Sequence, residues 1–483
     1  MGGQDSGQDN GQGFDTYGGA SSGRALIIHP QLKSTGPDSG RLPQGQLDEA
    51  EGLAIAIDLD VIAANIIVVN KPRPATLFGT GKVQEVAALI AAEDIEVAVL
   101  DTALTPIQQR NLERAWKCKV IDRTGLILEI FADRARTKEG RLQVELAQLT
   151  YQRSRLVRSW THLERQRGGI GTVGGPGETQ IEADRRQIDD RVVSLRKQLE
   201  SVVRTRELHR KTRREVPYPV VALVGYTNAG KSTLFNRLTG AEVMAEDQLF
   251  ATLDPTMRAV DIPGRGGRII LSDTVGFISA LPTQLVAAFR ATLEEVLGAD
   301  IIIHVRDAVH PDTEAQRHDV LSVLSDLGVP DDKRDGMIEV FNKIDLADQD
   351  PRERITNLVA RTPLSAAVSA ISGEGTEDLL TLIGQQAGRH ERTVRLSLPH
   401  EDGATLAWLY QAGEVMERRD DESNAWLVVR LDAANIGRLE KRLGRAIAPS
   451  EDLAKDLIED RSEDLAEDLA NEGDVDKTIK AAE

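Results

Sequence analysis

The sequence predicts a multidomain α/β protein whose largest domain carries a phosphate-binding loop. Short apolar runs alternate with helical patterns from Glu51 to about Asp133, and again from about Val216 to Gln386. Two segments with heptad spacing lie between these regions, and a Val-rich run leads into a Gly-rich loop at Gly225. Alternating strands and helices are typical of parallel sheets. The chain of 483 residues has room for several such domains.

Changes in composition and periodicity divide the chain into six segments. We expect a disordered N-terminal extension over residues 1–48, an α/β domain over 49–137, a basic antiparallel helical hairpin with a Gly-rich tip over 138–215, a second α/β domain over 216–388, a small α+β domain over 389–448 and an acidic tail over 449–483. The first 24 residues are mainly Gly, Ser, Gln and Asp, which offer little to bury, and residues up to about 46 are expected to be linker.

The charge is distributed unevenly along the chain. The net charge is −18, which by itself argues against nucleic acid as a partner. However, residues 133–215 hold 20 Lys/Arg against 12 Asp/Glu, a net charge of +8, whereas residues 450–483 hold 4 against 13, a net charge of −9. The average therefore hides a basic middle segment that suits an RNA partner.

Other features of the composition indicate a cytoplasmic protein. The single cysteine, Cys118, cannot form an internal disulfide and is expected to be a small buried side chain. No apolar run approaches the roughly 20 residues of a membrane span, and the N-terminus does not resemble a secretory signal. Nothing in the sequence demands a dimer, so we expect a monomer.

The first α/β domain is expected to contain three parallel strands and two helices. The strands are predicted over Ile66–Val69, Val97–Leu100 and Lys119–Ile121, and the helices over Val83–Ala92 and Pro106–Ala115. Gly79-Thr80-Gly81-Lys82 looks like part of a phosphate loop. It lacks the earlier Gly and the following Ser/Thr, so we interpret it as a turn before a helix.

The hairpin is predicted from two apolar stripes with heptad spacing. The first stripe, which is interrupted by Arg153, consists of Leu142, Leu146, Leu149, Leu156, Trp160 and Leu163. The second stripe consists of Ile188, Val192, Leu195, Leu199 and Val202. The Gly-rich stretch between them, Arg165–Gly177, cannot remain helical. Our candidate RNA contacts are Arg165 and Arg167 on one side of this tip and Arg185 and Arg186 on the other.

The nucleotide-binding loop follows the predicted strand Val220–Val224. Gly225-Tyr-Thr-Asn-Ala-Gly-Lys231-Ser232 fits the pattern GxxxxGK[ST] between a strand and a helix that starts near Thr233. In such a loop the backbone N–H groups surround phosphates, Lys231 reaches the β- and γ-phosphates, and the Ser232 hydroxyl binds Mg²⁺. Asp273-Thr-Val-Gly276 follows the strand Arg268–Leu271 and is expected to hold the Mg²⁺ shell and the γ-phosphate.

Two further motifs select guanine. Asn342-Lys343-Ile344-Asp345 follows the strand Ile338–Phe341, and Asp345 can accept both the N1–H and the exocyclic amine of guanine, a pair that adenine cannot supply. Asn342 can bridge to the phosphate loop, and Ser369-Ala370 can meet the guanine O6. A switch threonine should ligate Mg²⁺ when GTP is bound. Thr252 and Thr256 both qualify, and we favour Thr252.

The motifs together indicate a GTPase in which Lys231, Thr252 and Gly276 are catalytic. The expected GTP contacts are Gly225, Tyr226, Thr227, Asn228, Ala229, Gly230, Lys231, Ser232, Thr233, Phe250, Ala251, Thr252, Asp273, Gly276, Asn342, Lys343, Asp345, Ser369 and Ala370. The expected Mg²⁺ ligands are Ser232, Thr252 and Asp273. His304 and His310, near the strand Ile301–Val305, could suggest a second catalytic site, but each is expected to be a core or surface histidine.

Four stretches of the sequence together resemble the HflX family of translation-factor-class GTPases. They are the phosphate loop, Leu249–Thr256, Asp273–Phe277 and the tip sequence Gly168–Gln180. The resemblance covers roughly residues 50–446. It implies binding to the large ribosomal subunit, with its ribosomal RNA, and GTP-dependent splitting or rescue of idle or stalled ribosomes. It also supports Thr252 as the switch ligand.

The residue after Gly276 predicts slow hydrolysis by the protein alone. Ras-type GTPases carry a water-orienting Gln there, but this chain has Phe277, which cannot position water. We therefore expect acceleration by ribosomes. Asn228 resembles the Asn of potassium-activated GTPases, so a bound K⁺ could replace an arginine finger.

Two rival functions remain open on sequence. One is a ribosome-assembly or RNA-linked regulatory GTPase, which would bind precursor particles or tRNA. The other is a GTP-regulated scaffold whose acidic tail recruits a protein, which would show no RNA dependence. The C-terminal α+β domain is predicted from the strands Val394–Leu398 and Ala425–Leu431 around the helix Ala404–Ala412.

Overall fold

The computed structural model describes most of the chain, in two compact units. It describes residues 23–33, 41–166, 176–213, 218–241, 249–250, 252–253, 255–263, 268–279, 295–388, 391–421, 423–445 and 447. Unit 1 contains the chain up to Arg196 and also Leu249 and Phe250, and unit 2 contains the nucleotide-binding and C-terminal domains. Among the described residues no helix has both the length and the apolar character that crossing a membrane requires.

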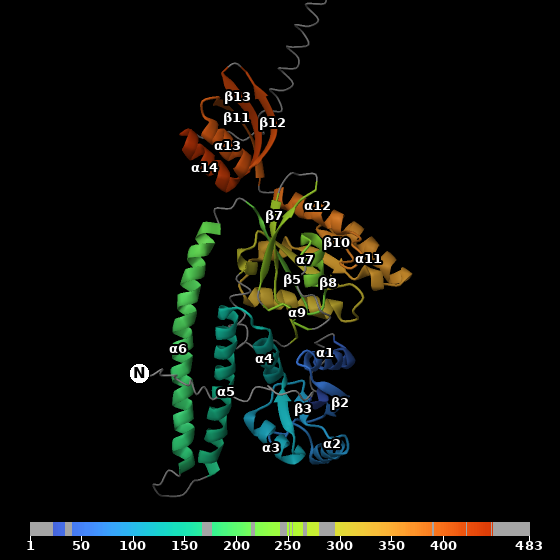
Figure 1. Ribbon diagram of the computed structural model, residues 1–483. Helices are drawn as coiled ribbons and strands as arrows, with labels where there is room; N and C mark the ends of the chain where they lie inside the picture. Colours follow the sequence, from blue (N-terminus) through green and yellow to red (C-terminus); the bar gives the residue numbers. More distant parts are fainter. Residues whose placement is uncertain are drawn as a thin grey trace, which may run out of the picture. The chain divides into compact units, whose positions relative to one another are not determined.

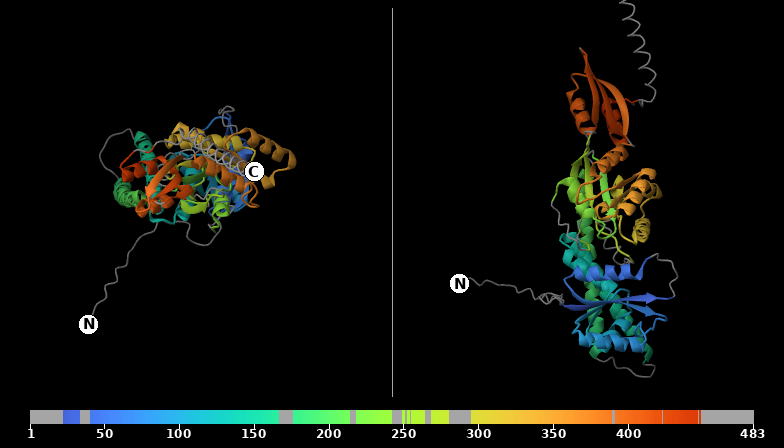
Figure 2. Two further views of the ribbon diagram at one scale, coloured as in Figure 1. Left: turned by 90° about the horizontal axis from the view of Figure 1, so that it is seen from above. Right: turned by 90° about the vertical axis from the view of Figure 1, so that its right-hand side faces the viewer.

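The N-terminal domain is a four-stranded parallel sheet covered by helices on both faces (Figure 1, Figure 2). The sheet order is β2-β1-β3-β4. The elements are β1 (Arg24–Leu32), α1 (Pro43–Ile55), β2 (Asp60–Val69), α2 (Thr80–Ala92), β3 (Val97–Leu100), α3 (Pro106–Trp116), β4 (Lys119–Asp122) and α4 (Arg123–Arg134). The three strands and two helices predicted here are confirmed, as is their parallel arrangement. α4 was not predicted.

The predicted disordered extension over residues 1–48 is wrong for part of its length. β1 occupies Arg24–Leu32 in the middle of the sheet, where Ala25, Leu26, Ile27 and Ile28 are fully buried. α1 then begins at Pro43. The apolar run from Ala25 to Ile28 was the available signal, because a strand buried on both faces is apolar throughout and lacks alternation. Residues 1–22 and 34–40 lie outside the described residues.

The helical hairpin consists of α5 (Lys138–Gln166) and α6 (Pro176–Arg213). Leu142, Leu149, Val192 and Leu195 of the two predicted stripes are buried. Arg191 pairs with Glu145 at 2.6 Å and Arg153 pairs with Asp189 at 2.8 Å, so the two helices run antiparallel. Arg153, the residue that interrupts the heptad stripe, therefore makes an ion pair between the two helices. Tip residues 167–175 lie outside the described residues.

The nucleotide-binding domain has a six-stranded sheet of order β10-β9-β8-β5-β7-β6, in which only β6 is antiparallel to its neighbour. Its strands are β5 (Val220–Gly225), β6 (Thr256–Asp261), β7 (Arg268–Asp273), β8 (Ile301–Asp307), β9 (Ile338–Asn342) and β10 (Ser365–Ala367). Its described helices are α7 (Lys231–Thr239), α9 (Thr313–Asp326), α10 (Asp331–Asp335), η2 (Ile344–Leu346), α11 (Gln349–Arg361) and α12 (Thr376–Ala387).

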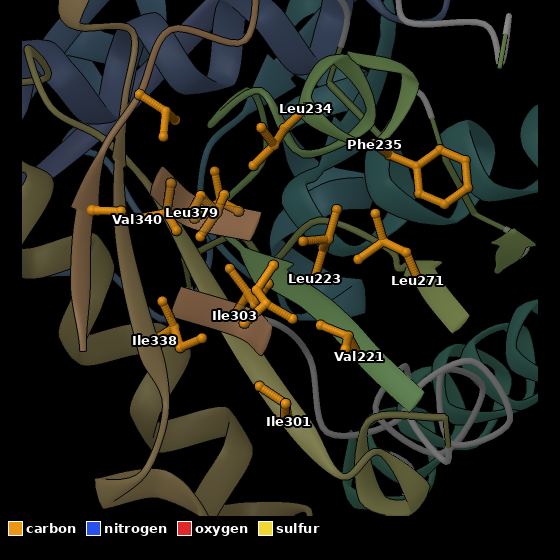
Figure 3. Packing of buried hydrophobic residues seen from close by; sticks show 14 of the residues in the cluster. Val221, Leu223, Leu234, Phe235, Leu271, Ile301, Ile303, Ile338, Val340 and Leu379 are labelled. Atoms are coloured by element: carbon orange, nitrogen blue, oxygen red, sulfur yellow. The ribbon is translucent and has the colours of Figure 1, made fainter. Parts of the chain in front are cut away.

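The core of this domain fixes the strands whose ends carry the motifs. Val221, Leu223, Ile303, Val340 and Leu379 belong to one buried cluster that joins the central strands to α7 and α12 (Figure 3). Parallel strands place their carboxyl ends at one edge of a sheet, which is where ligands bind in such folds. The motif loops after β5, β7 and β9 all leave from that edge.

The C-terminal domain is a small antiparallel sheet of order β11-β13-β12 with two helices. Its elements are β11 (Glu391–Pro399), α13 (Gly403–Ala412), β12 (Glu414–Asp420), β13 (Asn424–Asp432) and α14 (Ala433–Leu443). The two predicted strands and the predicted helix are confirmed, whereas β12 and α14 were not predicted. Its core includes Leu396, Leu409, Leu427, Val429 and Leu439. The acidic tail over 449–483 lies outside the described residues.

Candidate functional site

The loop after β5 has a backbone that only glycine fits at two positions. Gly225 has φ +154°, and a Cβ there would lie 2.1 Å from the Val305 carbonyl oxygen. Gly230 has φ +86°, and a Cβ there would lie 2.2 Å from Asn342 Nδ2. Asn228, between them, is exposed and also left-handed at φ 58°. The first and last glycines of the motif therefore allow close packing against β8 and β9.

Lys231 is the first residue of α7 and is buried beside the loop. Its Nζ donates a hydrogen bond to the Tyr226 carbonyl oxygen at 2.8 Å. Burial lowers the pKa of Lys231 to about 8, although the carboxylate of Asp273 acts in the opposite direction. Among the described residues this buried ammonium donates to a neutral carbonyl oxygen, so it would gain from a nearby phosphate.

Gly276, in the loop after β7, approaches the same lysine. A Cβ on Gly276 would lie 2.7 Å from Thr227 Cγ2 and 3.1 Å from Lys231 Nζ. The next residue, Phe277, joins this loop to the phosphate loop: its N–H donates to the Gly225 oxygen at 3.1 Å, and its oxygen accepts from Thr227 N–H at 2.7 Å. The Phe277 side chain is buried. The two loops are thus fixed to each other through backbone contacts.

Three oxygen-bearing side chains converge between these loops. Ser232 Oγ lies 2.8 Å from Thr252 Oγ1 and 2.7 Å from Asp273 Oδ2, and Thr252 Oγ1 lies 2.9 Å from the same carboxylate oxygen. Asp273 is fully buried, and its Oδ1 has no hydrogen-bond partner among the described residues. Burial raises the pKa of Asp273, opposed by the hydrogen bond from Ser232.

This donor set fits a hard cation. Hydroxyl and carboxylate oxygens are the ligands that Mg²⁺ prefers, and a buried carboxylate oxygen without a partner is costly unless a cation or water meets it. Of the two candidate switch threonines, Thr252 contacts the other two residues of the set, whereas Thr256 opens β6. The residues present therefore fit Mg²⁺.

The predicted guanine motif packs against the phosphate loop. Asn342 Nδ2 donates to the Ala229 carbonyl oxygen at 2.9 Å, and Asn342 Oδ1 accepts from Ala370 N–H at 3.0 Å. The bridge expected of Asn342 is confirmed. Lys343 has φ 66° and pairs with Asp307 at 2.9 Å, while Asp345 in η2 is exposed. Asn342 thus joins the segment that carries the Asp345 carboxylate to the Ser369–Ala370 loop.

Two residues that brace this region were not predicted. Arg237 of α7 donates from Nε to the Ala370 oxygen at 3.1 Å and also bonds the Ile371 oxygen, which fixes the loop that carries Ser369. Asp307, at the end of β8, holds Lys343. No sequence signal pointed to Arg237, because its partner lies 133 residues away in the chain.

The remaining candidate residues lie in different environments. Arg185 and Arg186 are exposed on α6, whereas Arg165 is described only as part of the α5 backbone, and Arg167 and Ala251 lie outside the described residues. Phe250 is buried. His304 is a buried core histidine: burial lowers its pKa to about 3.

His310 and Cys118 are structural as well. His310 accepts the Asp312 N–H at 3.0 Å, which caps the turn before α9. Cys118 is half-buried beside the N-terminal core, and burial raises the pKa of its thiol to about 11, so little reactive thiolate forms near neutrality.

Comparison with known proteins accounts for nearly the whole described chain. Four family models match in order: GTP-binding GTPase N-terminal (residues 44–132), GTP-binding GTPase Middle Region (134–213), 50S ribosome-binding GTPase (220–343) and HflX C-terminal domain (354–453). The chain is 54% identical over 402 residues to GTPase HflX of Magnetococcus marinus, covering 83% of this chain and 91% of the relative. The chain belongs to the HflX family of GTPases.

A second relative agrees with this assignment. GTPase HflX of Escherichia coli is 43% identical over 397 residues, covering 82% of this chain and 92% of the relative. Among solved structures, a complex of SsGBP with GDP is similar with a TM-score of 0.44 at 27% identity, covering 76% of this chain and 98% of that chain. As an HflX family member, the chain binds guanine nucleotide and hydrolyses GTP to GDP and phosphate.

Proposed function

We propose that this HflX family GTPase associates with the large ribosomal subunit and uses GTP to split or rescue stalled or idle ribosomes. The observation that carries the proposal is the match of residues 220–343 to the family model described as 50S ribosome-binding GTPase. The hairpin supports it, because residues 133–215 carry a net charge of +8 and Arg185 and Arg186 are exposed on α6. Basic surfaces bind RNA by neutralising phosphates.

In the proposed mechanism the chain's own residues hold the nucleotide in place. The N–H groups of the loop from Gly225 to Ser232 surround the phosphates. The buried ammonium of Lys231 pairs with the β- and γ-phosphates. Asp345 accepts the guanine edge, while Asn342 keeps the base loop and the phosphate loop in register. Ser232, Thr252 and Asp273 would hold Mg²⁺, which when bound neutralises the phosphate oxygens as negative charge shifts between them.

The hydrolysis step lacks a water-positioning side chain within the chain's own motif. Phe277 is buried and makes its hydrogen bonds through the backbone, so it offers no polar group to a nucleophile. The ribosome is proposed to supply or order the missing groups. Asn228 is exposed in the phosphate loop, and K⁺ held there would add positive charge. Equal hydrolysis rates in K⁺ and Na⁺ would refute this role of Asn228.

The test of ribosome splitting is sedimentation of purified 70S ribosomes. With the protein and GTP, we expect free subunits to accumulate, and with GDP we expect none. A variant lacking the tip residues 168–177 should bind GTP normally but fail to split ribosomes. Intact 70S particles with the unaltered protein and GTP would overturn the proposal. Binding confined to precursor particles or tRNA would favour the assembly alternative, and binding without any RNA dependence would favour the scaffold.

A further inference from the structure

Tyr226, the second residue of the phosphate loop, makes a side-chain contact with the loop after β7. The residue is buried, and its hydroxyl oxygen accepts the Ser279 N–H at 2.6 Å. Both residues belong to the same compact unit, although 53 positions separate them in the chain. Ser279 is the third residue after Gly276. This hydrogen bond therefore joins the phosphate loop to the segment that is expected to meet the γ-phosphate.

Gly276 lies between anchors on both of its sides. On the side of β7, Thr274 Oγ1 donates to a carbonyl oxygen of β5 at 2.6 Å. The next residue after the glycine, Phe277, makes two backbone hydrogen bonds to the phosphate loop. Two residues further on, the Tyr226 hydroxyl holds Ser279. The segment is thus held at both ends, and the hydroxyl is a side-chain anchor that a single substitution can remove.

The fit around Gly276 leaves little freedom for its backbone. A Cβ at this position would lie 2.7 Å from Thr227 Cγ2 and 3.1 Å from Lys231 Nζ, the ammonium that is expected to reach the γ-phosphate. An N–H···O hydrogen bond spans only about 2.7–3.2 Å between its heavy atoms and weakens steeply when it bends. A small displacement of this segment would therefore weaken a hydrogen bond from the Gly276 N–H to a γ-phosphate oxygen.

The hydrogen bond from Ser279 to Tyr226 occurs together with the arrangement expected for bound GTP. Thr252 Oγ1 lies 2.8 Å from Ser232 Oγ and 2.9 Å from Asp273 Oδ2, as expected of a switch threonine in the GTP state. Switch segments of GTPases are ordered by the γ-phosphate and released on hydrolysis. A contact made in one of two arrangements shifts the equilibrium toward that arrangement.

We propose that Tyr226 is a positioning residue for the γ-phosphate: its hydroxyl holds Ser279 and thereby keeps the Gly276 N–H in place for GTP. The inference rests on the proposed contact between Gly276 and the γ-phosphate, and it does not depend on the ribosome. GDP has no γ-phosphate, so the hydroxyl contributes to the affinity for GTP and leaves the affinity for GDP unchanged. A tyrosine that only stabilises the fold would affect both nucleotides alike.

The test uses the full-length chain and three variants, without ribosomes. Tyr226→Phe removes the hydroxyl and keeps the buried ring. Tyr218→Phe is the matched control, because Tyr218 precedes β5 in the same domain and is 37% exposed. Gly276→Ala tests the proposed γ-phosphate contact itself. The readouts are the affinities for GDP and for the non-hydrolysable imido analogue of GTP, kcat/KM for GTP hydrolysis and the unfolding temperature.

We expect Tyr226→Phe to lower the affinity for the GTP analogue about fivefold to tenfold, the size expected for one hydrogen bond. GDP affinity should stay unchanged, and kcat/KM should fall by at least the same factor. Tyr218→Phe should match the wild type, and Gly276→Ala should lose more affinity for the analogue than Tyr226→Phe does.

Two results with Tyr226→Phe would overturn the inference and leave the rest of the GTP site as assigned. One is an unchanged ratio of the two affinities while Gly276→Ala is impaired. The other is an equal loss for GDP and the GTP analogue, which would make the hydroxyl a purely structural group. A Gly276→Ala variant with the wild-type ratio would overturn the proposed γ-phosphate contact and the role of Tyr226 with it.

Discussion

The N-terminal domain and the nucleotide-binding domain each carry a Gly-rich stretch followed by a lysine, but only one of these stretches has the geometry of a phosphate site. Gly79 has an extended backbone, with φ −70° and ψ 156°, open space surrounds Gly79 and Gly81, and Lys82 pairs with Glu85 on the surface. In the other loop, Gly230 is left-handed and Lys231 is buried. The nucleotide site is distinguished by a buried lysine that makes no ion pair with the described residues and by the left-handed glycine that precedes it.

The polar groups at the two sheet ends differ in the same way. In the N-terminal domain they neutralise one another: Arg123 pairs with Glu49 and Asp101, His29 lies 2.8 Å from Asp101, and Arg155 lies 2.5 Å from Asp122. In the nucleotide-binding domain Asp273 keeps one oxygen without a partner among the described residues. A sheet end whose charges are already paired stabilises the fold, whereas one with spare donors and acceptors can take a ligand.

Substituting the corresponding glycines should give the largest contrast between the loops. Gly230→Ala places a Cβ 2.2 Å from Asn342 Nδ2 on a left-handed backbone, so we expect GTP affinity to fall about a thousandfold, or ~4 kcal/mol. Gly81→Ala meets open space and should leave affinity unchanged. Fluorescent-nucleotide titration measures both. Equal behaviour of the two variants would remove the basis of the comparison.

Breaking the charge network of the N-terminal domain should affect stability instead of nucleotide binding. Arg123→Ala leaves the buried carboxylates of Glu49 and Asp101 without their shared cation. The expected cost is about 3–5 kcal/mol in the free energy of unfolding of that domain, measured by denaturant titration, with GDP affinity unchanged. A loss of GDP affinity at full stability would contradict the assignment of this cluster to the fold.

The same network predicts how the domain responds to acid. Burial alone would raise the pKa of Asp101, but Arg123 and His29 outweigh burial and lower it from 3.8. A lowered folded-state pKa contributes stability above pH 3.8, and that contribution is lost as the pH falls through the folded-state value. Arg123→Ala should weaken this dependence.

Substitution of Asp273, the carboxylate proposed to bind Mg²⁺, should lower the rate of GTP hydrolysis. Asp273→Asn keeps the size of the side chain but removes its charge, so kcat should fall about a hundredfold at a fixed Mg²⁺ concentration. Asp261→Asn is the control, since Asp261 is exposed and pairs with Arg268 at 2.7 Å on the neighbouring strand. A steady-state GTPase assay gives both values. Full activity of Asp273→Asn would exclude the proposed metal site.

The smallest expected effect is a pH dependence of nucleotide affinity. Burial lowers the pKa of Lys231 to about 8 in the free protein, and a bound phosphate should raise it, so binding takes up a proton above pH 8. GTP affinity should therefore fall several-fold between pH 8 and pH 9. Lys82, which is paired on the surface, should have no part in this. An affinity that is flat to pH 9 would show that Lys231 stays protonated without nucleotide.

The strand and helix elements with strong local patterns were predictable, and so were the four nucleotide motifs. β3 was predicted with the bounds that the structure has, and Asn342 makes the bridge expected of it. β1 was missed because a strand buried on both faces has no alternation, and its neighbours in the sheet are 36 to 72 residues away in the chain. Arg237 was missed because no local pattern reports a partner 133 residues away.

The central claim is that this GTPase is slow alone and is activated by the ribosome. GTP hydrolysis at fixed K⁺ and Mg²⁺, measured with and without purified large ribosomal subunits, tests it most directly. The account predicts a rise of about tenfold or more, which corresponds to ~1.4 kcal/mol of barrier, and no such rise for the variant lacking residues 168–177. An unchanged rate with guanine nucleotide still bound would contradict the account and direct the search to protein partners of the acidic tail.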